Sequence, residues 1–214
     1  MEILSGIVSF ILHIDTHLGQ IINDYGTLSY LILFAIIFAE TGFVFTPFLP
    51  GDSLLFAAGA FAALGSFNIF LVLGVLWLAA FLGDTVNYWI GHFFGQALID
   101  NPKIPLKKEH IEKTQKFYDK YGGKTIFLAR FVPIVRTFAP FVAGVGKMEY
   151  GKFISFNLLG GLTWVSGFTL LGYFFGNIEF VKKNFSLVVI VIILLSIVPI
   201  IYEFTKAKLS KNKK

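Results

Sequence analysis

Apolar runs broken by few polar positions dominate the pattern of this chain. A spanning helix needs about 20 mainly apolar residues, and four runs approach or exceed that length. The sequence therefore predicts about four spanning helices, at residues 28–45, 69–99, 153–175 and 185–202. The second run is interrupted by Gly83-Asp84-Thr85, and one crossing is the economical interpretation of it.

The N-terminal residues 1–25 follow a different pattern. Isoleucine and leucine recur there at helical spacing, while serine, threonine, glutamine and asparagine occupy the other side. This pattern is typical of an amphipathic helix that lies on the membrane surface.

Two further segments are apolar but contain residues that disrupt helices. Residues 46–65 begin with a proline cluster and continue with only about a dozen apolar residues, too few to span. Residues 125–146 contain two arginines and two prolines. Irregular backbone inside a membrane must be buried in protein or line a wet cavity. We therefore expect two re-entrant hairpins, whose tips are shaped by backbone effects of Pro47, Pro50, Gly51, Pro133 and Pro140.

Charge is distributed unevenly along the chain. The first 102 residues carry seven acidic residues and no Lys or Arg, whereas the rest carries all 18 basic residues and six acidic ones. Seven lysines lie within residues 100–124 and five within residues 203–214, so the positive-inside rule places both segments in the cytoplasm. Counting crossings then puts both termini in the cytoplasm and makes the two hairpins enter from opposite sides.

Two opposed hairpins are the outline of an inverted repeat, in which broken segments meet near the bilayer midplane as in many transporters. The fold class predicted is an all-α polytopic membrane protein, with residues 1–214 forming a single membrane domain. Composition agrees, because 56% of the residues are hydrophobic and 14% charged, against about 45–50% and about 25% in soluble domains.

Composition also excludes several kinds of site. The chain has no cysteine, and its four histidines lack metal-ligand spacing, so we expect no metal and no cofactor. No Ser/His/Asp arrangement or nucleotide loop is present in the sequence, so we expect no enzyme activity. We also expect no nucleic-acid partner, and the sequence does not indicate an oligomeric state.

The two arginines of the chain give the strongest single signal. Arg130 and Arg136 lie six residues apart inside an apolar segment, whereas the other sixteen basic residues are lysines in polar stretches. Two arginines at a helix centre cost about 5–7 kcal/mol on insertion scales, so both need partners. Guanidinium groups bind carboxylates and phosphates equally well through paired hydrogen bonds. The arginines are therefore candidates either for binding a phosphate or for tying the hairpins together.

Three acidic residues inside apolar segments are the candidate partners. Burial and a neighbouring guanidinium have opposite effects on the proton affinity of a carboxylate, so Glu40 and Asp52 could bind and release a proton when the arginine contact changes. A static structural pair is an equal alternative. Asp84 and nearby Asn87 are secondary candidates, and a hydrogen bond across helices is the favoured role for Asp84.

These residues lie within an ordered set of motifs that resembles the DedA family, also called the SNARE-associated or VTT-domain family. The resemblance covers nearly the whole chain. It rests on Glu40-Thr41-Gly42, Pro47 to Asp52, Gly83-Asp84, Asn87-Tyr88, Gly91, Ala129 to Pro140 and Ala143-Gly144. The pattern continues with Met148, Phe153, Asn157, Gly160 and Trp164, to which no individual role is assigned.

The resemblance implies a bacterial inner-membrane location, two opposed re-entrant hairpins and translocation of lipids. It implies undecaprenyl phosphate as the transported anionic lipid, dependence on the proton motive force and a role in envelope integrity. Carried over by position, the essential acids of the family fall on Glu40 and Asp52 and its essential arginines on Arg130 and Arg136.

Function therefore has one leading hypothesis and two alternatives. The leading hypothesis is a flippase or scramblase whose partners are an anionic lipid, such as a polyprenyl phosphate or a phospholipid, the surrounding membrane lipids and protons. One alternative is a proton-coupled transporter of small cations. The other is a non-transporting membrane scaffold for envelope synthesis.

Overall fold

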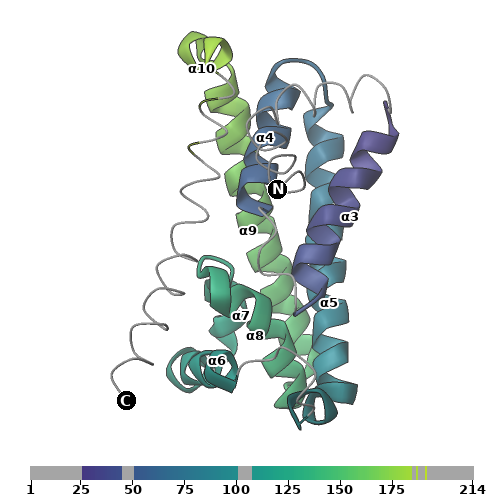
Figure 1. Ribbon diagram of the computed structural model, residues 1–214, viewed down its shortest axis with the longest axis vertical. Helices are drawn as coiled ribbons and strands as arrows, with labels where there is room; N and C mark the ends of the chain where they lie inside the picture. The colour runs from purple at the N-terminus through teal and green to yellow at the C-terminus, as the bar shows by residue number, and fades with distance from the viewer. Residues whose placement is uncertain (1–25, 45–50, 101–107, 185–186, 188–190, 192–214) are drawn as a thin grey trace, which may run out of the picture. The chain divides into compact units, whose positions relative to one another are not determined.

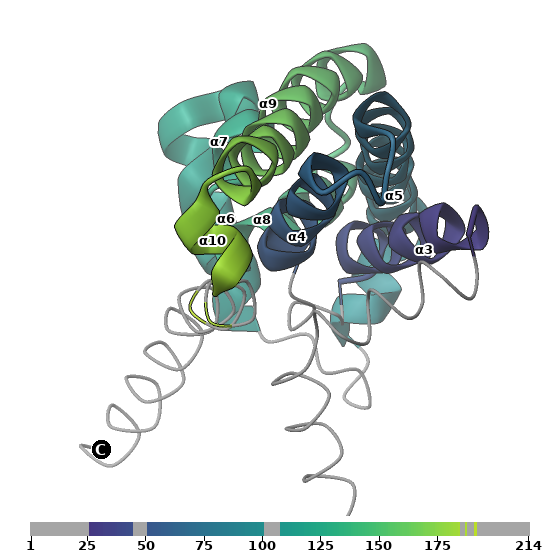
Figure 2. The ribbon, with the colours of Figure 1, turned by 90° about the horizontal axis from the view of Figure 1, so that it is seen from above.

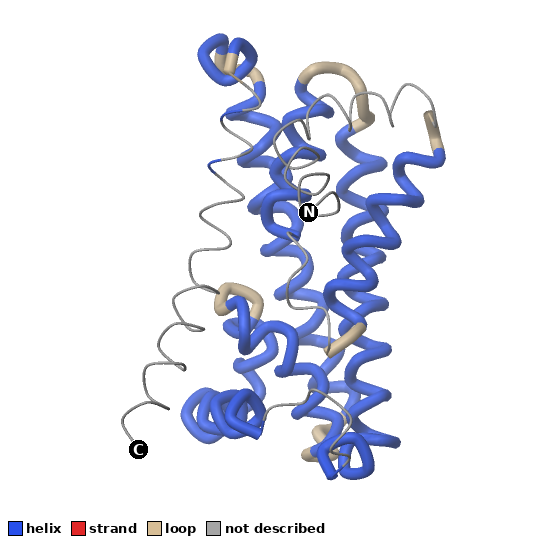
Figure 3. Tube along the Cα trace, viewed as in Figure 1, coloured by secondary structure: helices blue, strands red, loops and turns tan. Residues whose placement is uncertain are grey.

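The part of the chain that the structure, a computed structural model, describes is helical and contains no strand (Figure 3). It comprises residues 26–44, 51–100, 108–184, 187 and 191. Its helices are α3 (Leu28–Gly42), α4 (Gly51–Ala63), α5 (Ile69–Asp100), α6 (Lys108–Tyr121), the 3-10 turn η1 (Gly122–Lys124), α7 (Thr125–Ala129), α8 (Pro133–Val145), α9 (Tyr150–Gly176) and α10 (Glu179–Lys183).

Several predicted features lie outside the described residues. They are the amphipathic helix of residues 1–25, the tip of the first hairpin with Pro47 and Pro50, most of the span at 185–202 and the basic tail at 203–214. The described part therefore tests the middle of the predicted topology, and the re-entry of both hairpins stays a prediction.

Two of the described helices are long and apolar enough to cross a membrane. They are Ile69–Gly95, within α5, and Tyr150–Gly176, which is α9. The polar group Gly83-Asp84-Thr85 does not interrupt α5, so the prediction of one element through this stretch is confirmed. The short α4 is a different case, because 13 residues extend only about 20 Å as a helix, less than the roughly 30 Å of a hydrocarbon core.

The segment predicted as the second hairpin is broken in the middle. Helix α7 ends at Ala129 and α8 begins at Pro133. Val132 is extended, and the proline that follows it occupies the first turn of α8, where a missing N–H costs no hydrogen bond. The segment therefore consists of two short helices rather than one spanning helix, and Arg130 lies where they meet.

The described residues form two compact units. The first, called the α4 unit, comprises residues 26–33, 51–73 and 168–184. In it α4 packs on the last turns of α9 (Figure 2), and glycines permit the contact. A Cβ at Gly59 would overlap the Thr169 carbonyl, and one at Gly172 would overlap the Phe56 carbonyl.

The second, called the α6–α8 unit, comprises residues 34–44, 74–100 and 108–167. Its α6, α7 and α8 lie together in Figure 1. Their core includes Ile126, Val135 and Phe153, which are almost fully buried. Close approach of α5 and α8 depends on glycine, because a Cβ at Gly91 would overlap the Phe141 carbonyl.

The hydrophilic stretch 100–124 contains a structured element, α6, rather than only a loop. Its Tyr118 hydroxyl donates a hydrogen bond to the Ala139 carbonyl of α8 at 2.9 Å. Burial raises the pKa of Tyr118 well above its ordinary value, so the hydroxyl stays a donor. Lys116 and Lys120 are exposed on the same helix. An amphipathic helix thus covers the second hairpin segment.

Glycine at position 144 is expected to be essential for stability. A Cβ there would overlap the Tyr88 carbonyl, so Gly144→Ala should lower the free energy of unfolding by about 1–3 kcal/mol. The matched control is Gly167→Ala, where a Cβ meets nothing within 4 Å and replacing a helical glycine stabilises by up to about 1 kcal/mol. Thermal unfolding in detergent measures both, and equal melting temperatures would contradict the packing described.

Candidate functional site

Arg130 is one of three deeply buried charged residues described in the α6–α8 unit, with Glu40 and Asp84. It follows the last residue of α7, and 3% of its surface is exposed. Its Nη2 donates to Asp84 Oδ2 of α5 and to Asn157 Oδ1 of α9, both at 2.6 Å. One guanidinium nitrogen thus joins three helical segments through a charged and a neutral acceptor.

The rest of this guanidinium retains hydrogen-bonding capacity. Nε and Nη1 of Arg130 are buried and have no hydrogen-bond partner among the described residues. Buried donors without partners are uncommon and carry a desolvation cost of about 1–3 kcal/mol or more when charged. The space around them is provided by two glycines of α9, since a Cβ at Gly160 would lie 3.0 Å from Arg130 Nε and one at Gly161 3.5 Å from Nη2.

Arg136 forms a second ion pair with the C-terminal part of α3. Its Nη2 lies 2.6 Å from Glu40 Oε1, and the side chains are 10% and 2% exposed. The pair joins residues 96 positions apart in the chain, and both belong to the α6–α8 unit. An enclosed pair of this kind is costly unless both charges are well accommodated.

Trp164 brings the two ion pairs into one site. The Cζ atoms of Arg130 and Arg136 lie 5.7 and 5.0 Å from the centre of its ring. These distances are within the range of a cation–π attraction, which is worth about 2 kcal/mol when water is excluded. The tryptophan is fully buried in α9, so its position is fixed by packing.

Asn87 fixes the backbone around the site. Its Nδ2 donates to the Thr41 carbonyl of α3 at 3.0 Å and to the Thr137 carbonyl of α8 at 2.9 Å. Thr41 and Thr137 are the residues that follow Glu40 and Arg136 in sequence. A single amide of α5 therefore aligns the two backbone segments that carry the second ion pair.

Replacing Asn87 with leucine should destabilise the α6–α8 unit. The Thr41 carbonyl lies in the last turn of α3, where carbonyls lack helical partners, so losing its donor costs about 1–3 kcal/mol. Asn177→Leu is the control, because this exposed amide bonds only within its own turn and should shift stability by less than about 0.5 kcal/mol. Thermal unfolding in detergent compares the two variants, and equal losses would argue against the role of Asn87.

The structure thus gathers five of the predicted site residues into one unit: Arg130, Arg136, Glu40, Asp84 and Asn87. Asp84 was expected to make a hydrogen bond across helices, and its partner proves to be the charged Arg130. Asp52 lies in the first turn of α4 and belongs to the α4 unit. Among the described residues, no group of three His, Cys, Asp or Glu side chains could hold a metal ion.

Two residues of the site were not identified as functional from the sequence. Asn157 is a polar residue in an apolar span, and such a residue is by itself a candidate for a functional role. Trp164 gives no such signal, because one tryptophan in an apolar helix is ordinary. Its role depends on the position of α9 beside both arginines.

Comparison with known proteins identifies relatives along most of the chain. The VTT domain matches residues 49–174. Protein DedA of Escherichia coli strain K12 is 50% identical over 211 residues, which cover 97% of this chain and 96% of that protein. An uncharacterized membrane protein of Mycobacterium tuberculosis strain H37Rv is 44% identical over 169 residues, covering 77% and 73%. Inner membrane protein YghB of E. coli strain K12 is 35% identical over 156 residues, covering 72% and 71%. No solved structure matches the chain.

The mycobacterial relative and YghB are named as a membrane protein and an inner membrane protein, which agrees with the two long apolar helices α5 and α9. The domain match covers more than half of the chain, and half of the aligned residues are identical to those of a relative of nearly equal length. The chain is therefore a membrane protein that belongs to the DedA family of VTT-domain proteins.

Proposed function

We propose that this protein carries an anionic lipid across the bacterial inner membrane, with undecaprenyl phosphate as the leading candidate for that lipid. The observation that carries the proposal is the pair of buried arginines beside Trp164, of which Arg130 keeps two donors that have no hydrogen-bond partner in the described part of the chain. A guanidinium in this state matches the oxygens of a phosphate monoester, which accept two parallel hydrogen bonds.

Charge balance connects phosphate binding to protons. The cluster of Arg130, Arg136, Glu40 and Asp84 is neutral when all four groups are charged. A phosphate monoester adds between one and two negative charges, and excess charge in an enclosed site is costly. Uptake of a proton by Glu40 or Asp84 offsets one of these charges and frees an arginine for the phosphate. Transport would then depend on the proton motive force.

Two geometric steps complete the cycle that we propose. The lipid phosphate replaces a carboxylate at the arginines from one leaflet, and the broken segment of α7 and α8 changes the side from which the site is reached. Asp52, on the first hairpin segment, is proposed as a further proton carrier. The hairpins enter from opposite faces, and both termini lie in the cytoplasm.

The direct test is leaflet exchange in proteoliposomes that contain fluorescently labelled undecaprenyl phosphate. A membrane-impermeant quencher reports the outer-leaflet fraction over time, with and without an imposed pH gradient. We expect exchange that is faster than in protein-free vesicles and that responds to the gradient. Equal rates in both vesicle types would refute the proposal. A proton-driven cation flux in the same vesicles without lipid exchange would support the alternative of a small-cation transporter.

A second candidate function is supported by the ion pairs themselves. Both arginines contact carboxylates at 2.6 Å. Such pairs can have a purely structural role, in which they hold helices together. The protein would then be a non-transporting scaffold. The two functions differ in what they require of Arg136, since a structural pair needs a cation and a phosphate site needs the planar fork of a guanidinium.

A further inference from the structure

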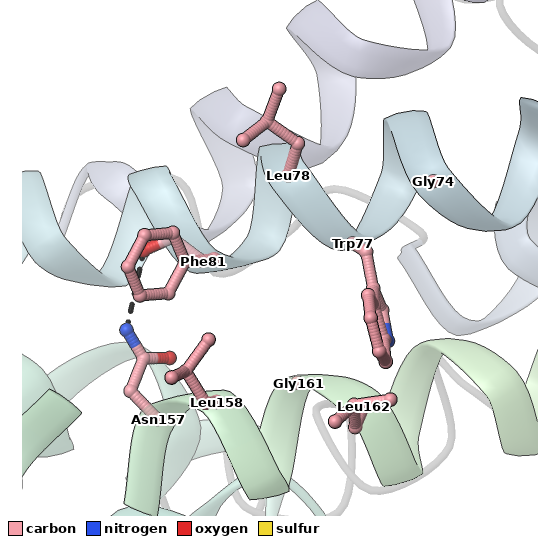
Figure 4. Close-up of a pocket in the computed structure, with 8 residues that line it drawn as sticks. All are labelled: Gly74, Trp77, Leu78, Phe81, Asn157, Leu158, Gly161 and Leu162. Carbon is pink, nitrogen blue, oxygen red and sulfur yellow. Dashed lines mark hydrogen bonds between the residues drawn. The ribbon is translucent and has the colours of Figure 1, made fainter. Parts of the chain in front are cut away.

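A groove runs along the α6–α8 unit between α5 and α9 (Figure 4). Its volume is about 210 Å³, and its lining is mostly apolar. Residues that bear on the argument are Gly74, Trp77 and Phe81 of α5 and Asn157, Leu158 and Gly161 of α9. Leu158 is 47% exposed and Trp77 37% exposed, so the groove is open along part of its lining.

One end of the groove leads to the arginine site. Asn157 donates from Nδ2 to the Phe81 carbonyl at 3.2 Å, the dashed contact of Figure 4, while its Oδ1 accepts from Arg130. Gly161 lines the groove, and a Cβ at that position would lie 3.5 Å from Arg130 Nη2. Asn157 and Gly161 therefore both line the apolar groove and adjoin the buried guanidinium.

Size limits what the groove can hold. Sites for whole small molecules occupy about 300–1,000 Å³, so a groove of about 210 Å³ accommodates a part of a ligand. Its apolar walls exclude a sugar or a peptide segment with polar backbone, because unpaired polar groups are costly to bury. A short stretch of one hydrocarbon chain fits both the volume and the lining, whereas two chains side by side do not.

We propose that this groove binds the phosphate-proximal stretch of a single polyprenyl chain while the phosphate of the same lipid reaches Arg130. The inference rests on the proposed function and extends it, because it assigns a site to the tail of the lipid. Charge complementarity selects the orientation: the anionic end lies toward Asn157 and Arg130, and the chain extends toward Trp77. The groove then selects for lipid phosphates with one chain over those with two.

Gly74→Leu tests the groove without touching the arginine site. A Cβ at Gly74 meets nothing within 4 Å, so a larger side chain can start from this position, and glycine is a poor helix former that leucine replaces favourably. Gly167→Leu is the matched control, since it is an equally open glycine of α9 that does not line the groove. We expect at least a tenfold slower exchange of polyprenyl phosphate for Gly74→Leu and an unchanged rate for Gly167→Leu.

A binding measurement separates failure of the groove from failure of the function. Purified protein is exposed to a polyprenyl phosphate that carries a diazirine on the isoprene units next to the phosphate, and the adducts are mapped by mass spectrometry. We expect labels within residues 74–81 and 157–162, and their loss in Gly74→Leu but not in Gly167→Leu. Labels in the groove without lipid exchange would refute the proposed function and support the groove. Exchange by wild-type protein that Gly74→Leu leaves unchanged, with labels elsewhere, would overturn the groove and leave the function standing.

Discussion

Replacing Arg130 with alanine is expected to abolish lipid exchange and also to destabilise the protein. Removing one partner of a buried ion pair costs about 3–5 kcal/mol, because Asp84 would be left enclosed without its cation. Loss of the donors that we assign to the phosphate should reduce exchange by at least a hundredfold. Thermal unfolding and the vesicle assay measure the two effects on the same preparation.

A double variant separates stability from transport. Asp84→Ala removes the stranded carboxylate, so Arg130→Ala combined with Asp84→Ala should recover part of the lost stability, as expected when contacting residues are coupled. Exchange should not recover, because the phosphate ligand is still missing. Restored exchange in the double variant would mean that Arg130 only neutralises Asp84, and the transport role of this arginine would have to be abandoned.

Replacing Arg136 with lysine is expected to leave the fold intact and to reduce lipid exchange by at least tenfold. The contact with Glu40 joins one nitrogen to one oxygen at 2.6 Å, and a lysine ammonium can make such a contact. Lysine also keeps the attraction to the Trp164 ring. What it cannot supply is the planar pair of donors that matches a phosphate.

The control for this variant is Lys183→Arg, which replaces lysine with arginine in an exposed ion pair with Glu179. This substitution should change neither the stability of the fold nor the rate of lipid exchange. The measurements are the melting temperature and the initial exchange rate. A stable Arg136→Lys protein that exchanges lipid at the wild-type rate would show that transport does not need the planar fork of this guanidinium. A variant that supports growth fully in cells lacking the native gene but exchanges no lipid would favour the scaffold.

The sequence predicted which residues belong to the candidate site better than it predicted which of them form pairs. Arginine in an apolar segment is expensive, so the positions of Arg130 and Arg136 identified the site before any geometry was known. The helix break at Pro133 followed from the same segment, because proline removes a backbone donor. The continuity of α5 through Gly83-Asp84-Thr85 was predicted as well, since nothing there forbids helix.

Pairing depends on the relative positions of helices, which a local pattern does not contain. Glu40 and Asp84 are equally plausible partners of Arg130 from charge alone, and only the placement of α3 and α5 assigns Glu40 to Arg136 instead. The same limit explains why Asn157 was missed as a ligand of Arg130. The amphipathic α6 was obscured because its lysines dominated the interpretation of residues 100–124 as a cytoplasmic loop.

The position of Trp164 has a consequence for how the two ion pairs respond to each other. Its ring attracts both guanidiniums, whose Cζ atoms lie 5.7 and 5.0 Å from the ring centre. A shift of the ring that improves one contact therefore also changes the other. Two groups that compete for one partner are thermodynamically linked, so a change at Arg130 alters the free energy at Arg136 and the reverse. Opening of one pair is therefore expected to bias the other, so the two pairs should respond together rather than independently.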